Sequence, residues 1–378
     1  MKYRIPFNRP CFAGNEQAYI LEALASGKIS GDGIFSKQCH ALLERELQAD
    51  KVLLTTSCTH ALEMAALLLN IGPGDEVVVP SYTFVSSINA FILRGAKPVF
   101  ADIRPDTLNL DESRLEPLLT GRTKAVVAVH YAGVGCEMDD ILALTRPRSV
   151  SLVEDNAHGL FGAYKGRPLG GFGELATQSF HETKNFTCGE GGALVINNPS
   201  LSARAEILRE KGTNRSSFFR GEIDRYTWVD VGSSYLPSEV LAGFLYAQLE
   251  KRVEIQSQRQ LIWERYRDGL SGWSQRMGAL MPTVPAHCGQ SFHMFYLIMP
   301  SLDSRQRLIE HLKKRSILSV FHYVPLHLSP MGRQYGGYEG QCPVTEDLSE
   351  RLLRLPFYND LDQASQNEVI EAVLTFTS

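Results

Sequence analysis

The chain has 378 residues, 44% of them hydrophobic, and carries a formal net charge of −4 at pH 7. A chain of this length can bury a large core and form more than one lobe. The small negative charge argues against nucleic acid or an anionic membrane as the main partner, although local basic clusters could still hold a phosphorylated small molecule.

The cysteines and the apolar runs bear on the compartment. The seven cysteines are odd in number and no two have CxxC spacing, so we expect neither a disulfide framework nor a zinc ribbon. The first residues, MKYRIPFNRPCFAG, contain no apolar leader, and no run reaches the ~18 apolar residues of a membrane-spanning helix. We therefore expect a cytoplasmic protein with no membrane segment.

The first part of the chain combines helices with a regular series of strands. Residues 15–48 show a helical pattern around the glycine-rich turn SGKISGDG (26–33), and from about residue 50 to 200 short apolar runs alternate with helical patterns. The apolar runs are VLL (52–54), EVVVP (76–80), PVFAD (98–102), AVVAVHYAG (125–133), VSLVED (150–155), ATQSF (176–180) and GALVIN (192–197). This alternation predicts an α/β fold with a mostly parallel sheet and helices on both faces.

The last third of the chain has a different pattern. One long helical pattern covers residues 238–270 and could bridge two lobes. After it come apolar runs at 292–299 and 319–325 and helical patterns near 304–315 and 364–376. We therefore expect a large domain over residues 1–250 and a smaller α+β domain over residues 251–378.

Asp155 follows an apolar run in the segment VEDNAH (153–158). Ligands of open parallel sheets bind beyond the carboxyl ends of the strands. A carboxylate there can pair with a protonated ring nitrogen. The alternative is that Asp155 caps the start of a helix.

Lys184 lies in the segment SFHETKNFTCGEGGALVIN (179–197), between one predicted strand and the next. A lysine in a partly dry, cationic site has a lowered pKa and can form an imine with an aldehyde. Gly189, Gly191 and Gly192 leave room for the close approach of a backbone or a ligand. The alternative is an ordinary solvated lysine.

Two further segments each follow a predicted strand. In TTSCTHALEMAALLL (55–69), Ser57 and Thr59 lie where a helix begins, so free N–H groups and the helix dipole favour a phosphate there; simple N-capping is the alternative. In PSYTFVSS (80–87), Tyr82 and Phe84 could stack on a planar ring, or belong to the core.

Together these segments supply a phosphate cradle, an aromatic face, an acid for a ring nitrogen and a lysine for an aldehyde. A lysine imine and an acidic partner for a pyridinium nitrogen are the marks of pyridoxal 5′-phosphate enzymes. The sequence therefore predicts this cofactor.

The chain also resembles the DegT/DnrJ/StrS-type sugar aminotransferases nearly end to end. The segments that carry the resemblance are SGKISGDG, KVLLTTSCTHALEMAALLL, GDEVVVPSYTFVSS, FADIRPDTLN, VHYAGVGCEMD, SFHETKN, EKGTNRSSFFRG, YTWVDVGSSYL and FHYVPLH. The resemblance implies the fold type I architecture, a homodimer with shared active sites, and transamination. It favours transamination over dehydration because related sugar dehydratases replace the lysine with histidine.

The resemblance further implies roles for individual residues. Lys184 would bind the cofactor's aldehyde, Asp155 its ring nitrogen, and His158 would lie near its phenolic oxygen. Groups expected around the phosphate are Ser57, Cys58, Thr59, Ser179 and, from the partner subunit, the position of Ser234 in GSSY (232–235). Phe84 would stack on the ring. Relatives often carry Asn or Lys where this chain has Ser234, and a hydroxyl gives a weaker phosphate contact.

The substrates are implied by the same resemblance. L-glutamate is expected to donate the amino group, and the acceptor is expected to be dTDP-4-keto-6-deoxy-D-glucose, aminated at C4 to the galacto product. Candidate substrate contacts are Arg215, Arg220 and His327, although loop arginines are often only solvated and His327 could be structural. Another nucleotide keto sugar, or a pyridoxal-phosphate regulatory protein, is the alternative.

Two other patterns in the sequence suggest a dinucleotide or a metal. GFGELA (171–176) has the letters of a dinucleotide-binding turn but precedes a strand, so we reject that interpretation. His322 and His327 could suggest a metal, but no further ligand has supporting spacing, so we expect no metal site.

Overall fold

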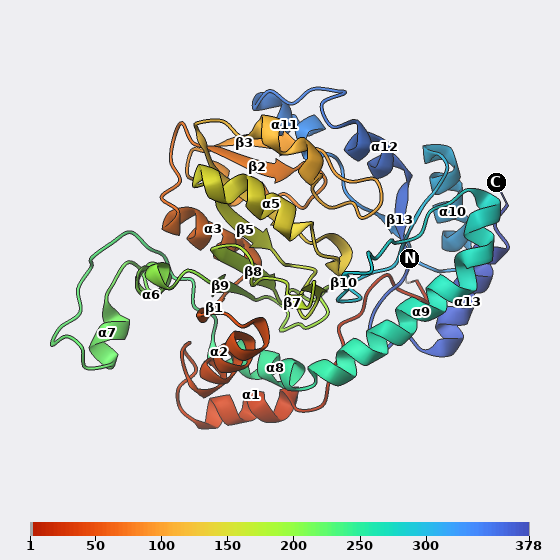
Figure 1. Cartoon of the computed structure of the whole chain (residues 1–378). Coiled ribbons are helices and arrows are strands. Elements are labelled where there is room, and N and C mark those ends of the chain that lie inside the picture. Colours follow the sequence, from red (N-terminus) through yellow and green to blue (C-terminus); the bar gives the residue numbers. More distant parts are fainter. Residues whose placement is uncertain (1–2, 378) are drawn as a thin grey trace.

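The computed structural model describes residues 3–377 and is built around one seven-stranded sheet (Figure 1). Its strands are β1 (Lys51–Thr55), β2 (Glu76–Pro80), β3 (Lys97–Ala101), β4 (Thr123–Val129), β5 (Ser151–Asp155), β8 (Leu175–Ser179) and β9 (Gly192–Ile196). They lie in the order β1-β9-β8-β5-β4-β2-β3, and only β9 runs against its neighbours. The predicted α/β fold with a mostly parallel sheet is confirmed.

Helices cover both faces of this sheet because its strands are apolar on both sides. In β2, Val77 and Val79 pack into one core and Val78 into another. The first core includes α3 (Cys58–Leu68), α4 (Ser86–Ile92) and α6 (Ser202–Arg209); the opposite face carries α2 (Ile34–Leu47), α5 (Met138–Thr145) and α8 (Glu239–Glu250). The ends of β1, β2, β5 and β8 therefore meet at one edge between two helical layers.

The long helix expected over residues 238–270 is divided in two. α8 ends at Glu250 and α9 (Arg252–Met277) begins after Lys251, whose backbone (φ −93°, ψ 18°) departs from helical geometry. Figure 1 shows α9 crossing from the large sheet to the C-terminal lobe. We propose the domain boundary at this break, which gives residues 1–250 and 251–378.

The C-terminal lobe packs helices against a small antiparallel sheet. The strands lie in the order β11 (Tyr296–Ile298), β13 (Leu352–Arg354) and β12 (Val320–Phe321). Its core joins them to α9, α10 (Leu302–Lys314) and α13 (Gln363–Leu374), and also takes in Ile5 from the beginning of the chain. No helix within residues 3–377 is long and apolar enough to cross a membrane.

Candidate active site

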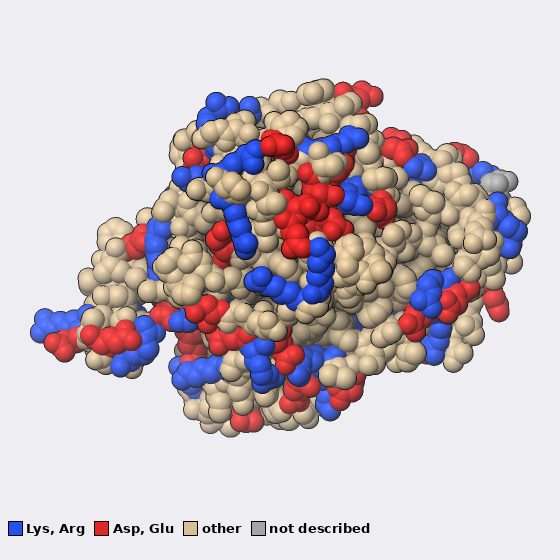
Figure 2. Space-filling model, viewed as in Figure 1, with Lys and Arg blue, Asp and Glu red and all other residues tan. Residues whose placement is uncertain are grey.

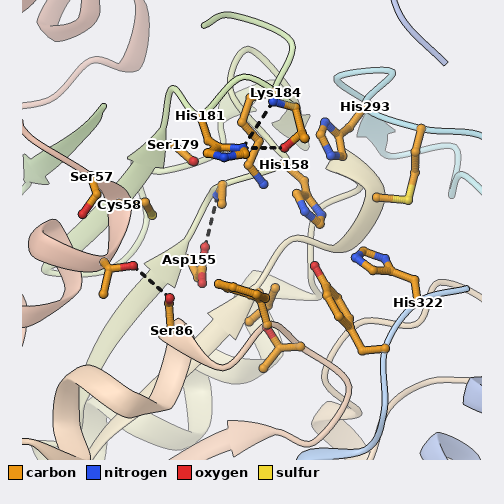
Figure 3. A pocket seen from close by; sticks show the side chains of 18 of the residues that line it. Ser57, Cys58, Ser86, Asp155, His158, Ser179, His181, Lys184, His293 and His322 are labelled. Carbon is orange, nitrogen blue, oxygen red and sulfur yellow. Dashed lines mark hydrogen bonds between the residues drawn. The ribbon is translucent and has the colours of Figure 1, made fainter. Parts of the chain in front are cut away.

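A cavity of about 600 Å³ lies at the carboxyl edge of the large sheet and is lined by both lobes (Figure 3). Eight of the residues singled out in the sequence line it: Ser57, Cys58, Thr59, Phe84, Asp155, His158, Ser179 and Lys184. They come from the ends of β1, β2, β5 and β8 and from the segments that follow these strands. The topology thus brings these four predicted segments together.

Asp155 is the last residue of β5, and both of its carboxylate oxygens are held. Oδ2 accepts a hydrogen bond of 2.7 Å from the Ser87 hydroxyl, and Oδ1 accepts one of 3.2 Å from the Ala157 backbone N–H. This second contact belongs to a turn and not to a helix cap, because a turn and not a helix follows β5. Asp155 therefore presents a fixed carboxylate to the cavity.

The neighbouring Glu154 faces away from the cavity, as alternation along a strand requires. Its buried carboxylate accepts hydrogen bonds from the backbone N–H groups of Gly170, Phe172 and Gly173. The GFGELA segment thus holds a protein carboxylate, in agreement with our rejection of a dinucleotide site. The hydrogen bonds of Glu154 therefore stabilise the fold and do not contribute to the cavity.

Lys184 lies in the turn between β8 and β9, where its backbone N–H donates to the carbonyl of His181 at 2.9 Å. Figure 3 shows its side chain among those of His158, His181 and His293. Burial lowers the pKa of the Lys184 ammonium. A lowered pKa makes the neutral, nucleophilic amine more accessible, as the sequence led us to expect.

The start of α3 forms one end of the cavity. The Ser57 hydroxyl caps the helix by accepting from the His60 N–H at 3.1 Å, and Thr59 Oγ1 lies 2.8 Å from Ser86 Oγ. A Cβ on Gly192 would lie 2.3 Å from the Ser57 carbonyl carbon, so β9 can approach this turn only with glycine there. Burial raises the pKa of the Cys58 thiol to about 12.

The two aromatic candidates, Tyr82 and Phe84, lie in different environments. Tyr82 is buried in the core, whereas Phe84 lines the cavity with 57% of its surface exposed, so its ring face is open to a ligand. His158 stacks on His293 with ring centroids 4.2 Å apart and planes 15° apart. His158 Nδ1 is buried and has no hydrogen-bond partner within residues 3–377.

The opposite wall of the cavity was not foreseen. It is formed by residues of the C-terminal lobe and the chain start: Phe7, Asn8, His293, Met294, His322, Tyr323, Arg354 and Phe357. The histidines inside apolar runs, FHMFYLIM and SVFHYVP, and the arginine inside LLRLP were the available signals. Burial lowers the pKa values of His158, His293 and His322 well below the ordinary value, so all three imidazoles are neutral near pH 7.

Four candidate residues lie outside the cavity of this single chain. His327 is fully buried with its ring nitrogens bonded to Ser81 at 2.6 Å and Glu346 at 2.8 Å, which favours the structural alternative. The roles of the other three residues stay predictions. Arg215 stacks on Phe219, and Arg220 forms ion pairs with Glu206 and Glu222. Ser234 is exposed, and its backbone forms a β-bridge with Glu210.

The sequence and the fold of this chain are similar to those of known proteins. Residues 10–374 match the DegT/DnrJ/EryC1/StrS aminotransferase family. The chain belongs to this family. Membership confirms the predicted family, fold and enzyme class, an aminotransferase that uses pyridoxal 5′-phosphate.

Individual relatives align over almost the whole chain. The spore coat polysaccharide biosynthesis protein SpsC of Bacillus subtilis is 32% identical over 98% of this chain and 96% of its own length. GDP-perosamine synthase of Escherichia coli O157:H7 is 30% identical over all of both chains. The putative sugar aminotransferase Spr1654 of Streptococcus pneumoniae, in its PMP form, superposes with a TM-score of 0.92 over 98% of both chains at 27% identity.

The residues of the cavity fit the cofactor. Asp155 is fixed for a ring nitrogen, the α3 N-terminus offers backbone N–H groups for a phosphate, and the buried Nδ1 of His158 lacks a partner. The half-buried side chain of Lys184 lines the same cavity. Each of the four chemical requirements is thus met by a separate group.

Proposed function

We propose that this family member transfers the amino group of L-glutamate to C4 of dTDP-4-keto-6-deoxy-D-glucose, giving dTDP-4-amino-4,6-dideoxy-D-galactose. The observation that carries the proposal is the convergence of Lys184, Asp155 and the start of α3 on one cavity of about 600 Å³. The cavity also has room for a sugar beside the cofactor.

Pyridoxal 5′-phosphate, when bound, supplies an aldehyde that accepts amines and a protonated ring that withdraws electrons. In this proposal Lys184 Nζ would bind the aldehyde and Asp155 would keep the ring nitrogen protonated. Ser57, Cys58, Thr59 and Ser179 would hold the phosphate. Phe84 would cover a ring face, and His158 would hydrogen-bond the phenolic oxygen.

Lys184 has a second role as the base. Once the donor's amino group has displaced it from the aldehyde, Nζ would take the proton from the donor's α-carbon and deliver it to the former aldehyde carbon. The lowered pKa favours the neutral amine that this transfer needs. Ser87 and the Ala157 N–H hold Asp155 in place throughout. Donor and acceptor use the cavity in turn, so we expect ping-pong kinetics.

The identity of the sugar rests on resemblance. The segments SGKISGDG, FFRGEIDRYTW and FHYVPLH are most similar to those of enzymes that form 4-amino-4,6-dideoxygalactose. The 30% identity with GDP-perosamine synthase favours one alternative, a keto sugar linked to another nucleotide. Arg215 and Arg220 are the proposed contacts for the diphosphate.

A homodimer with shared active sites is part of the proposal. The arm around α7 (Arg215–Phe219) extends away from the large domain (Figure 1) and exposes 69% of Phe219 and 76% of Trp228. Aromatic side chains this exposed are typical of an interface. The same arm leads to Ser234, which would reach the partner's phosphate. We also place the protein in the cytoplasm, in line with the free thiols of all seven cysteines.

The test is direct. Enzyme, cofactor and L-glutamate are incubated with dTDP-4-keto-6-deoxy-D-glucose, its 3-keto isomer and a GDP-linked 4-keto sugar, and products are assigned by proton NMR couplings. An axial C4 amine on the dTDP sugar is expected. An equatorial C4 amine would contradict the galacto product, and turnover of only the 3-keto or GDP sugar would contradict the acceptor.

A further inference from the structure

Arg354 is held rigidly at the wall of the cavity. It ends β13, the central strand of the small sheet, where it is paired with Tyr296 on one side and Val320 on the other. Its guanidinium carbon lies 4.5 Å from the centre of the Phe7 ring, and both residues line the cavity. The backbone of Arg354 is therefore held by the sheet and not by a flexible loop.

The guanidinium of Arg354 lacks a counter-charge. Its Nε is buried without a hydrogen-bond partner within residues 3–377, and the groups that act on its charge are the phenols of Tyr82, Tyr131 and Tyr323, none of them a carboxylate. Burial lowers the pKa of Arg354. Arg354 is partly buried, and a charge that is withdrawn from water without a protein partner destabilises a fold, so its place at the wall of a cavity points to a ligand.

Other buried arginines of this chain show the contrast. Arg209 binds both oxygens of Asp32 at 2.6 Å. Arg259 donates to the carbonyls of Phe292 and His293 and to the side chain of Asn359. Arg209 Nε, like Arg354 Nε, lacks a partner within residues 3–377, but the carboxylate of Asp32 neutralises the charge of Arg209. Arg354 differs because none of its guanidinium nitrogens forms a hydrogen bond or an ion pair within these residues, and its side chain lines the cavity.

Neither of the two carboxylates that line the cavity is paired with Arg354. The lining carboxylates are those of Asp155 and Glu190. Asp155 is engaged by Ser87 and assigned to the ring nitrogen, and Glu190 is an exposed side chain 3.6 Å from His181. Among the lining cations, Lys184 is assigned to the aldehyde. One positive charge therefore remains for a negatively charged group of a substrate.

We propose that Arg354 binds a carboxylate of the amino donor. This inference rests on the proposed transamination, in which every amino acid donor brings a carboxylate into the cavity. The planar guanidinium can bind a carboxylate through two parallel N–H···O bonds. The cofactor's phosphate is served by the start of α3, which belongs to the large domain, so it does not compete for Arg354.

The same chemistry has a second possible source, a carboxylate on the sugar. The two half-reactions separate the sources, because the donor reacts alone in the first and the sugar alone in the second. The donor is the better match because its carboxylates are small and must enter the dry cavity, whereas the dTDP-linked acceptor of the proposed reaction has no carboxylate.

The experiment compares Arg354→Met and Arg354→Lys with the wild-type holoenzyme. Bleaching of the visible cofactor band by L-glutamate gives the dissociation constant and limiting rate of the first half-reaction. In Arg354→Met we expect about 10- to 100-fold weaker donor binding and little change in the sugar half-reaction. Arg354→Lys should lie between, because an ammonium keeps the charge but not the two parallel bonds.

The control is Arg351→Met. Arg351 pairs with Asp347 and lies outside the cavity, so its variant should bind donor normally. A purely structural Arg354 would give a lower melting temperature in Arg354→Met, whereas removal of an unpaired charge should leave it unchanged or raised.

A comparison of L-glutamate with L-glutamine identifies the carboxylate. If Arg354→Met binds both amino acids equally more weakly than the wild type does, Arg354 binds the α-carboxylate. If only the binding of glutamate is weakened, Arg354 binds the side-chain carboxylate. Normal donor binding by Arg354→Met, or a defect confined to the sugar half-reaction, would overturn the proposal. Failure of the wild type with every keto sugar would instead contradict the proposed function, and the donor comparison would still be made with the amino acid that bleaches the wild type best.

Discussion

Ser87 donates a hydrogen bond of 2.7 Å from its hydroxyl to Asp155 Oδ2, and both residues are buried. Ser87 lies in α4 after β2, and Asp155 ends β5, so the contact joins two segments that the sheet topology brings together. It orients the carboxylate that we assign to the ring nitrogen. Ser87 is therefore a positioning residue for Asp155.

The first prediction concerns this pair. Ser87→Ala should keep the cofactor but lower kcat about tenfold, because Asp155 loses a charge-assisted hydrogen bond. Asp155→Asn should lower the rate of the glutamate half-reaction by about a hundredfold or more, because an amide cannot hold the ring proton by charge. Single-turnover spectra measure both, and an unchanged rate in Asp155→Asn would remove Asp155 from its assigned role.

Lys184→Ala should have no measurable turnover while its circular dichroism and melting profile stay close to those of the wild type. The reason is that one amine both binds the aldehyde and accepts the donor's proton. The variant should also lack the visible band that a lysine-bound cofactor gives. Wild-type activity in this variant would contradict the whole site assignment.

Glu154→Gln should act on stability and not on the chemistry. Its carboxylate accepts three backbone hydrogen bonds, and an amide nitrogen in place of one oxygen would leave N–H groups unpaired. We expect a loss of about 2–3 kcal/mol in the free energy of unfolding, measured by urea titration. At a temperature where the variant is folded, its glutamate half-reaction should match that of the wild type; a hundredfold loss there would make Glu154 the ring-nitrogen partner.

The buried histidines predict a loss of stability in acid. His158, His293 and His322 have pKa values well below 6.5 in the folded protein, so the unfolded chain binds more protons as the pH falls below 6.5. The free energy of unfolding should fall by about 1.4 kcal/mol per pH unit for each of them. Differential scanning calorimetry of His293→Gln should show a shallower dependence between pH 6.5 and 5; an equal slope would show that His293 does not contribute.

The arm predicts how the protein assembles. Sedimentation should give a homodimer, and Trp228→Glu together with Phe219→Glu should shift it toward monomer, because the charges disfavour burial of the aromatic surface. Activity should fall with dimer content if Ser234 completes the partner's site. A wild-type monomer that is fully active at assay concentration would contradict the shared site.

The choice between Glu154 and Asp155 shows one limit of the sequence. Alternation along a strand already required these neighbours to face opposite sides, but the letters VEDNAH did not say which side was the cavity. The tertiary structure decided it. The turn around Gly170–Gly173 donates hydrogen bonds to Glu154, and the hydroxyl of Ser87 donates one to Asp155.

The histidines of FHYVPLH show another limit. The sequence offered His327 as a substrate candidate with a structural role as the alternative, whereas His322 lines the cavity and His327 is enclosed by Ser81 and Glu346. The segment has no sustained periodicity, so its pattern does not predict which side chain faces which neighbour.

The sequence by itself determined the α/β class, the cofactor and the segments at the ends of the large sheet's strands, among them Ser57, the pair Glu154 and Asp155, and Lys184. These could be predicted because the carboxyl end of a parallel strand is a local feature that can be located along the chain, and all such ends meet at one edge. The reversed direction of β9, the break at Lys251 and the wall that carries His293 and Arg354 were decided only by the tertiary structure. The pairing of β9 with β1 and the contacts of His293 with His158 and of Arg354 with Phe7 join segments more than a hundred residues apart. Local propensity carries no information about which distant surfaces will pack together.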